Sequence, residues 1–138
     1  MIRTTDHEVR TRGQGDGIDL TDTVARAIAD SGVQEGVATV FVSGSTAGVS
    51  AVEFEDGVVH DLDRTLERMA PRRGEYQHHL RWNDDNGSSH VRAAIVGPSL
   101  SVPFRAGRLL LGAWQQIVLF EFDTRPRTRR YVVQVMGE

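Results

Sequence analysis

The segment QIVLFEFD, residues 116–123, restricts the fold of this chain more narrowly than any other stretch. Successive side chains of a β-strand point to opposite faces of its sheet. Ile117 and Leu119 would therefore share one face, while Val118 and Phe120 would share the other. A strand that is apolar on both faces belongs in the centre of a sheet, where both faces are covered. We expect this segment to be such a central strand.

Other segments predict further strands. Three lie in the same C-terminal third of the chain, with the sequences SLSVP, RLLLG and RRYVVQVMG. The stretch DTRPRTR, before the last of them, has the composition of a hairpin turn. Earlier in the chain, GVATVFVSG predicts a buried strand that ends at Val42, VSAVEFE predicts a second one, and residues 8–12 predict a weaker one.

Apolar residues at helical spacing predict up to three helices. The first begins at Thr21 and ends at Gly32, the second runs from Asp56 to Pro71, and the third spans residues 89–96. Between the second and third helices lies a polar stretch of about 18 residues, and an uninterrupted loop of that length in a compact domain is usually functional.

The chain has 138 residues, which suits a single domain over residues 1–138. We expect an α+β fold: a mostly antiparallel sheet or sandwich with two or three helices. No apolar run approaches the roughly 18 residues of a membrane span, and the N-terminus lacks a signal-peptide core. We therefore expect a cytoplasmic protein without membrane contact. The net charge of −3 argues against nucleic acid as a partner.

The chain contains no cysteine, and all 16 of its basic residues are arginine. These absences exclude disulfides, thiolate nucleophiles, cysteine-based zinc sites and a lysine Schiff base. An anionic ligand would have to be bound by arginine, histidine, backbone N–H groups or a metal ion.

The stretch NGSSH, at the expected start of the third helix, is the first candidate site. The free N–H groups of a helix N-terminus attract phosphate or carboxylate, and Gly87 would let a ligand approach the backbone closely. Ser88, Ser89 and His90 could contact the same ligand. The alternative is an ordinary capped helix with a histidine on the surface.

A second candidate is a metal site formed by the polar stretch and the helix start. Histidine and carboxylate side chains can bind a divalent cation, and one of His78 and His79, together with Asp84 and His90, would supply its ligands. The spacing matches no standard zinc motif. Mg²⁺ is one such cation, held by Asp84 or Glu53. We expect no organic cofactor and no tight zinc binding.

The stretch GSTAG follows the buried strand that ends at Val42. Small and hydroxyl residues at this point, Gly44, Ser45 and Thr46, can form a backbone pocket for an anion, or simply a turn. Glu53 would belong to the site only if it lies on the same side of its strand.

Two later stretches also allow two interpretations. Trp114 and Gln115 could line a pocket, or Trp114 could be a core residue. The arginines of RPRTRR could bind phosphate or belong to a solvated hairpin, and we favour the hairpin.

Two motifs reveal a resemblance. W-x-D-x-N-G-x-S-H, present as WNDDNGSSH, and G-x-W-Q-x-I, present as GAWQQI, are similar to those of the YjbQ-like family, uncharacterised proteins later described as secondary thiamine-phosphate synthases. The resemblance covers essentially the whole chain, including GSTAG and EFE.

The resemblance implies a small α+β protein that assembles as a homotrimer and binds a phosphorylated small molecule. It implies a reaction that joins hydroxymethylpyrimidine diphosphate to a thiazole phosphate and releases diphosphate. The alternative is a trimeric protein that binds a small anion or phosphometabolite, with only promiscuous activity. The residues that match the family's site are Glu53, His78 or His79 (with His79 favoured), Asp84, Asn86, Ser89, His90, Trp114 and Gln115.

The sequence departs from many relatives at the end of the buried strand. Where they carry His-Thr-Ser-Ala, this chain has Gly44, Ser45, Thr46 and Ala47, as does another branch of the family. A histidine is also common among relatives at the position of Ser88. The change at Gly44 removes one ligand from a three-histidine metal site.

Overall fold

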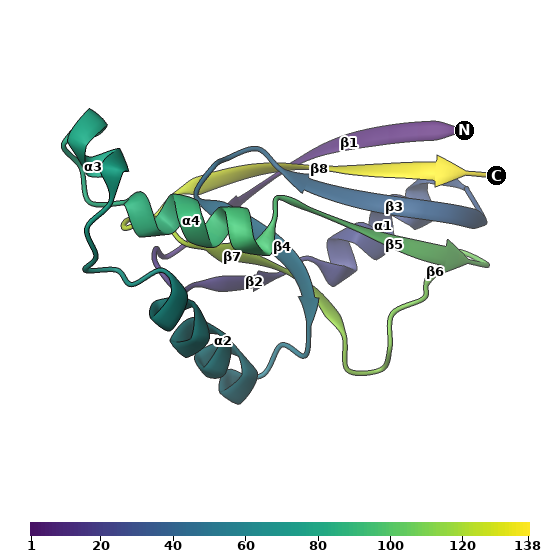
Figure 1. Ribbon diagram of the computed structural model, residues 1–138. Coiled ribbons are helices and arrows are strands. Elements are labelled where there is room, and N and C mark those ends of the chain that lie inside the picture. The colour runs from purple at the N-terminus through teal and green to yellow at the C-terminus, as the bar shows by residue number, and fades with distance from the viewer.

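The computed structural model describes all residues from 1 to 138 and contains four helices and eight strands. Figure 1 labels these elements along the chain. The strands are β1 (Ile2–Arg10), β2 (Gly17–Asp19), β3 (Glu35–Val42), β4 (Ala47–Val52), β5 (Ser99–Arg105), β6 (Arg108–Leu109), β7 (Gln116–Glu121) and β8 (Thr128–Gly137). The helices are α1 (Thr21–Ser31), α2 (Asp56–Met69), α3 (Gln77–Trp82) and α4 (Gly87–Val96).

The strands form two antiparallel sheets, which confirms the predicted α+β class. The larger sheet has the order β1-β8-β3-β5-β6, and the smaller one has the order β2-β7-β4. In the larger sheet, Val42 of β3 pairs with Tyr131 of β8. In the smaller sheet, Ala47 of β4 pairs with Glu121 of β7. These two pairs bring the β3–β4 turn and the β7–β8 turn to the same end of the molecule.

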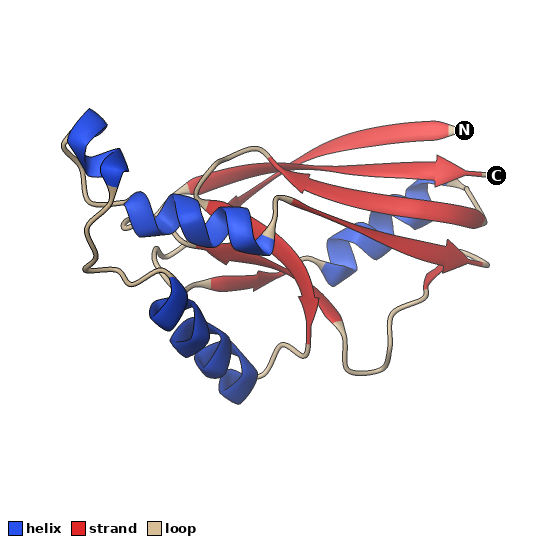
Figure 2. Cartoon of the chain, viewed as in Figure 1, coloured by secondary structure: helices blue, strands red, loops and turns tan.

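The main core lies between the two sheets and includes one face of α1. It buries Val40 and Val133 of the larger sheet, Leu119 of the smaller sheet and Ile28 of α1. Helices α2 and α4 cover the opposite face of the smaller sheet, where Leu66 and Phe120 belong to a second cluster. Figure 2 shows this arrangement of helices around the sheets.

Strand β7 is the central strand that its sequence predicted. It lies between β2 and β4, and every residue from Ile117 to Glu121 is buried. Ile117 and Leu119 belong to the core between the sheets, whereas Val118 and Phe120 belong to the cluster under α2 and α4. Both apolar faces are thus covered within one chain.

One group of exposed apolar residues lies on the outer face of the larger sheet. Val37 pairs with Met136 and Phe41 with Val132 across β3 and β8. Val37, Phe41 and Met136 are 38%, 44% and 48% exposed. If a partner covers apolar surface, it covers this face rather than β7.

Several local predictions were correct and others were wrong. Helix α1 ends at Gly32, whose φ of 74° is left-handed and suits glycine. Helix α2 is capped by Glu55, not Asp56, because the Glu55 carboxylate accepts hydrogen bonds from the N–H groups of Gly57 and Val58. The polar stretch after Pro71 is not one long loop, because it contains α3.

Helix α4 is tied to α2 by a buried arginine. The guanidinium of Arg92 is 1% exposed and donates to the carbonyl of Ala70 and to the carboxylates of Asp63 and Glu67. Each carboxylate also pairs with Arg72. A paired and hydrogen-bonded charge is tolerated in the interior. The network fixes the orientation of α4 and so of its N-terminus.

Candidate functional site

A polar pocket lies where the β3–β4 turn, the N-terminus of α4 and the β7–β8 turn meet. Two backbone hydrogen bonds join the turns: Ser43 N–H donates to Arg130, and Phe122 N–H donates to Thr46. The pocket has a volume of about 330 Å³, and none of its eleven lining residues is hydrophobic. The lining residues are Ser43, Gly44, Ser45, Thr46, Asn86, His90, Asp123, Arg127, Thr128, Arg129 and Arg130.

The structure therefore brings five of the residues singled out from the sequence to one pocket. Gly44, Ser45 and Thr46 come from the β3–β4 turn, and Asn86 and His90 come from the start of α4. The GSTAG turn thus meets Asn86 and His90 at one pocket. Asp123 and the arginines of the β7–β8 turn complete the pocket.

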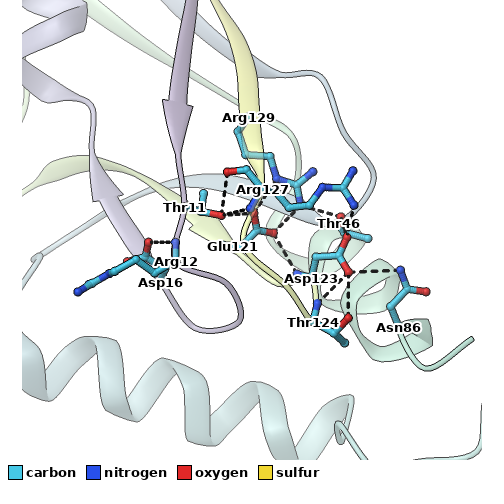
Figure 3. A network of polar contacts seen from close by, with 10 residues as sticks. All are labelled: Thr11, Arg12, Asp16, Thr46, Asn86, Glu121, Asp123, Thr124, Arg127 and Arg129. Atoms are coloured by element: carbon cyan, nitrogen blue, oxygen red, sulfur yellow. Dashed lines mark hydrogen bonds and ion pairs between the residues drawn. The ribbon is translucent and has the colours of Figure 1, made fainter.

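Asp123 is the central acceptor of this pocket (Figure 3). Its carboxylate accepts hydrogen bonds from the Thr46 hydroxyl at 3.1 Å and the Thr124 N–H at 2.8 Å, and it pairs with Arg127 at 2.8 Å. Burial alone would raise its pKa, but these hydrogen bonds and the arginine charge outweigh burial and hold the pKa below its ordinary value. Asp123 is therefore ionised at neutral pH.

A buried ion pair lies behind Asp123, between Arg129 and Glu121, whose side chains are 3% and 0% exposed. Nε of Arg129 donates to one carboxylate oxygen at 2.8 Å, and Nη2 donates to the other and to the Thr46 hydroxyl. The Thr11 hydroxyl and the Asp123 N–H also donate to Glu121. Each Glu121 oxygen has two donors, so this charge is fully satisfied.

His90 lies at the mouth of the pocket, and the ring of His78 packs against it with 4.4 Å between the ring centroids. Burial, together with the charge that His78 would carry, lowers the pKa of His90 below 6.5. The carboxylates of Asp123 and Asp84 and the backbone of Ser45 oppose this shift without cancelling it. His90 is thus mainly neutral at pH 7 and can still donate one ring N–H.

Asp84 and Asn86 stand beside this histidine pair. The carboxylate of Asp84 lies 2.9 Å from Nδ1 of His78. The amide nitrogen of Asn86 reaches Asp123 at 3.4 Å or, with the amide turned, Asp84 at 3.1 Å. In either orientation Asn86 links the α4 N-terminus to a carboxylate. Asp84 does not line the pocket itself, although its charge raises the pKa of the neighbouring His90.

The structure places His78, rather than the favoured His79, against His90, and neither of the two lines the pocket. Both histidines lie on the short helix α3 within the predicted polar loop. Nε2 of His79 accepts the N–H of Gly87 at 3.1 Å, so His79 caps α4. A Cβ at position 87 would lie 2.5 Å from Tyr76, so tight packing requires this glycine. His79 and Gly87 support the helix and do not line the pocket.

Ser88 and Ser89 were predicted to bind the ligand, but neither lines the pocket. They are 1% and 0% exposed, and neither hydroxyl has a hydrogen-bond partner in the chain. Helix α4 starts at Gly87, with Asn86 as its N-cap, so the two serines already lie in its buried first turn. Their small size lets α4 pack closely on the protein.

Glu53, Trp114 and Gln115 lie at the other end of the smaller sheet. Val52 of β4 pairs with Gln116 of β7, whereas the pocket adjoins the opposite ends of these strands. At about 3.3 Å per residue, the separation along β4 is on the order of 20 Å. Trp114 is 74% exposed, so it is neither a core residue nor part of this pocket.

The proposed metal ligands do not fit a metal ion within one chain. No group of three or more His, Asp or Glu side chains has a geometry that could hold one. His79 is engaged with Gly87, and the His78 and His90 rings pack against each other. The donor set of His79, Asp84 and His90 is therefore dispersed.

Asp123 was not singled out from the sequence, and the phosphate interpretation of the RPRTRR arginines, Arg127 and Arg129 among them, was set aside in favour of the hairpin. The hairpin exists, but its arginines also line the pocket. Glu121 gave a usable signal, since a carboxylate in a strand that is apolar on both faces has to be buried with a partner. Arg129 of the neighbouring strand is that partner.

An antiparallel α+β fold with an arginine-containing polar pocket is thus defined, and comparison with known proteins identifies its family. The family model described as UPF0047 protein YjbQ-like matches residues 5–138. The chain belongs to this family.

Its relatives span bacteria and archaea. A UPF0047 protein of Methanocaldococcus jannaschii is 32% identical over 133 residues, covering 96% of this chain and 93% of that protein. The UPF0047 protein YugU of Bacillus subtilis is 32% identical over 131 residues, covering 94% and 96%. A UPF0047 protein of Mycobacterium bovis is 41% identical over 106 residues, covering 77% and 80%.

The fold of this chain matches solved structures over its full length. A crystal structure from Sulfolobus solfataricus, described as a YbjQ-like protein of unknown function, has a TM-score of 0.89 at 28% identity and covers 100% of both chains. A hypothetical protein from Aeropyrum pernix has a TM-score of 0.88 at 28% identity and covers 99% of both chains. None of the four helices is long and apolar enough to cross a membrane.

Proposed function

We propose that the pocket binds the phosphate groups of a small molecule, and that the protein uses it to make thiamine phosphate. One observation carries the proposal: three arginines converge on a pocket that is lined by no hydrophobic residue. Arginine presents several N–H groups in a fixed plane that matches phosphate oxygens. With no lysine in the chain, arginine is the only strong cation available.

Arg127 and Arg129 are held by carboxylates that are almost fully buried, whereas Arg130 pairs only at the surface. Arg127 pairs with Asp123, Arg129 with Glu121, and Arg130 with Glu8 at 3.2 Å. Because each charge has a partner, the pocket attracts a phosphate through directed N–H groups rather than through a large excess of positive charge. Donors held in place before binding lose little entropy when the ligand arrives.

The proposed reaction needs charge stabilisation and no covalent intermediate. The bond between the pyrimidine methylene carbon and the diphosphate oxygen breaks, and its electron pair leaves with diphosphate. The lone pair of the thiazole nitrogen forms the new carbon–nitrogen bond, which gives a thiazolium cation. Arg127 would neutralise the leaving oxygens, and neutral His90 would donate an N–H to them.

The oligomer is part of the proposal. We propose a homotrimer in which copies cover the apolar pairs Val37–Met136 and Phe41–Val132. Apolar patches of this kind on a sheet commonly mark an interface. Glu53 and Trp114 could then act only on the pocket of a neighbouring copy. Light scattering at micromolar concentration should give three times the mass of one chain, and a clean monomer would contradict the assembly.

The second candidate is a binding protein for a phosphorylated metabolite, with only promiscuous activity. The dispersed metal-ligand set and Gly44 at the strand end favour it. Incubation with hydroxymethylpyrimidine diphosphate and thiazole phosphate, with and without Mg²⁺, separates the two candidates. The enzyme proposal expects thiamine phosphate and released diphosphate, both reduced in Arg127→Gln but not in Arg105→Gln. Substrate binding without any product would contradict it and favour the binding protein.

A further inference from the structure

Arg129 has one N–H-bearing nitrogen that the protein does not use. Its side chain is 3% exposed, and both Nε and Nη2 donate to acceptors within the chain. Nη1 donates to none of them. The only fully buried side-chain nitrogen or oxygen atoms without a partner are the hydroxyls of Ser88 and Ser89, so Nη1 of Arg129 remains accessible to a ligand. Arg129, which carries this free nitrogen, lines the polar pocket.

Gly44 determines where this nitrogen can lie. A Cβ atom at position 44 would be 2.7 Å from Nη1 of Arg129, which is closer than Cβ atoms approach other atoms. Arg129 cannot move aside cheaply, because Glu121 and Thr46 hold the rest of its guanidinium. The free nitrogen therefore occupies space that any side chain at position 44 would take.

We propose that Arg129 is an anion-binding residue for a phosphate or diphosphate group, and that Gly44 makes it available. This inference rests on the proposed function and names the donor and the ligand group. Nη1 donates to a phosphate oxygen in the pocket, while Glu121 fixes the plane of the guanidinium from behind. Gly44, Ser45 and Thr46 line the same pocket, and backbone N–H groups of such a turn can bind the same anion.

The arrangement also explains what a side chain at the strand end would do. A histidine at position 44 would displace the guanidinium and could not act together with it. Chains with glycine at this position would bind the anion through arginine, whereas a chain with a bulky residue would need another donor. Gly44→His should therefore weaken anion binding in this protein.

Titration calorimetry with inorganic diphosphate tests the proposal on the wild-type protein, Gly44→Ala and Gly112→Ala. Gly44→Ala changes no charge and adds one methyl group against Nη1. Gly112 is an exposed glycine at the far end of the molecule, so its alanine variant controls for the substitution. We expect Gly44→Ala to weaken binding about tenfold or more, the factor of one hydrogen bond to a charged group, and Gly112→Ala to change nothing.

A second measurement needs no variant. In side-chain ¹H–¹⁵N spectra of the wild-type protein, diphosphate should shift the guanidinium resonances of Arg129 and leave those of exposed Arg105 unchanged. If the wild-type protein and Gly44→Ala bound diphosphate with equal affinity, the inference would be overturned and the proposed function would stand. The same would follow if diphosphate bound to the wild-type protein without shifting the Arg129 resonances. No binding to the wild-type protein would overturn both.

Discussion

The imidazole rings of His78 and His90 lie against each other, with 4.4 Å between their centroids and 38° between their planes. His78 comes from α3 and His90 from α4, so the contact joins the two helices beside the pocket. A charge on His78 disfavours a proton on His90, and Asp84 is hydrogen-bonded only to His78. The pair therefore controls the charge at the mouth of the pocket.

The first prediction concerns this charge. His90 has a folded-state pKa below its unfolded value of about 6.5, so the unfolded chain binds more protons as the pH falls. The contribution of His90 to stability is present above that value and is lost as the pH drops through the folded pKa. Between about pH 7 and pH 5, the wild-type protein should therefore lose more unfolding free energy than His90→Gln.

Urea unfolding across this range, with an NMR titration of the His90 ring, measures both quantities. The other groups that face His90, namely His78, Asp84 and Asp123, remain in both proteins, so the difference isolates His90. A ring pKa at or above 6.5, or parallel stability curves, would contradict the prediction.

The second prediction concerns the buried ion pair behind the pocket. Glu121→Gln removes a charge that Arg129 requires, because both side chains are buried. Breaking a buried pair on one side costs about 3–5 kcal/mol. Chemical denaturation should show a loss of that size. Glu35→Gln, which removes the carboxylate of an exposed pair with Arg105, is the matched control and should change stability by less than about 1 kcal/mol. Equal losses of unfolding free energy in Glu121→Gln and Glu35→Gln would contradict the prediction.

The third prediction separates the neighbouring histidines. His79→Ala removes the acceptor for the Gly87 N–H and should lower the unfolding free energy by about 1 kcal/mol, as loss of a helix cap does. It should leave diphosphate affinity unchanged. His90→Ala should reduce the proposed synthesis by about 10²-fold or more while changing stability by at most about 1 kcal/mol. Loss of diphosphate binding in His79→Ala would contradict the role of His79 as a helix cap. Wild-type synthesis in His90→Ala would contradict the role of His90 in the reaction.

The fourth prediction concerns Arg127, whose side chain is 35% exposed and reaches the pocket from the hairpin. Arg127→Gln should weaken diphosphate binding at least tenfold, because it removes a donor and leaves the Asp123 charge without its arginine. Equilibrium binding at several salt concentrations provides the measurement. Arg105→Gln makes the same change in net charge far from the pocket and is the control. An equal loss of diphosphate affinity in that variant would argue for a general charge effect.

The fold was predictable where a pattern has only one structural solution. Apolar residues on both faces of residues 117–122 require a covered central strand, and β7 is one. Gly32 marks a helix end because a left-handed residue there favours glycine. Helix α3 was missed because its six residues, QHHLRW, bury no side chain and so show no apolar face.

The candidate site was predictable only in part. The Gly44–Thr46 turn and His90 were found because small residues at a strand end and polar residues at a helix start have known uses. Arg127 and Asp123 were not found, because only the pairing of β4 with β7 and β3 with β8 carries them to that turn. Glu53 and Trp114 were grouped with this site for the same reason. The direction of β4 and β7 places both residues at the end of the smaller sheet that lies away from the pocket.

The central claim is that the pocket at the β3–β4 and β7–β8 turns binds a phosphate group. A crystal structure of the protein soaked with diphosphate tests it most directly. We predict diphosphate density between Arg127, Arg129 and the N–H groups of residues 44–46. Diphosphate bound elsewhere, for example beside Trp114, with an empty arginine pocket would contradict the account.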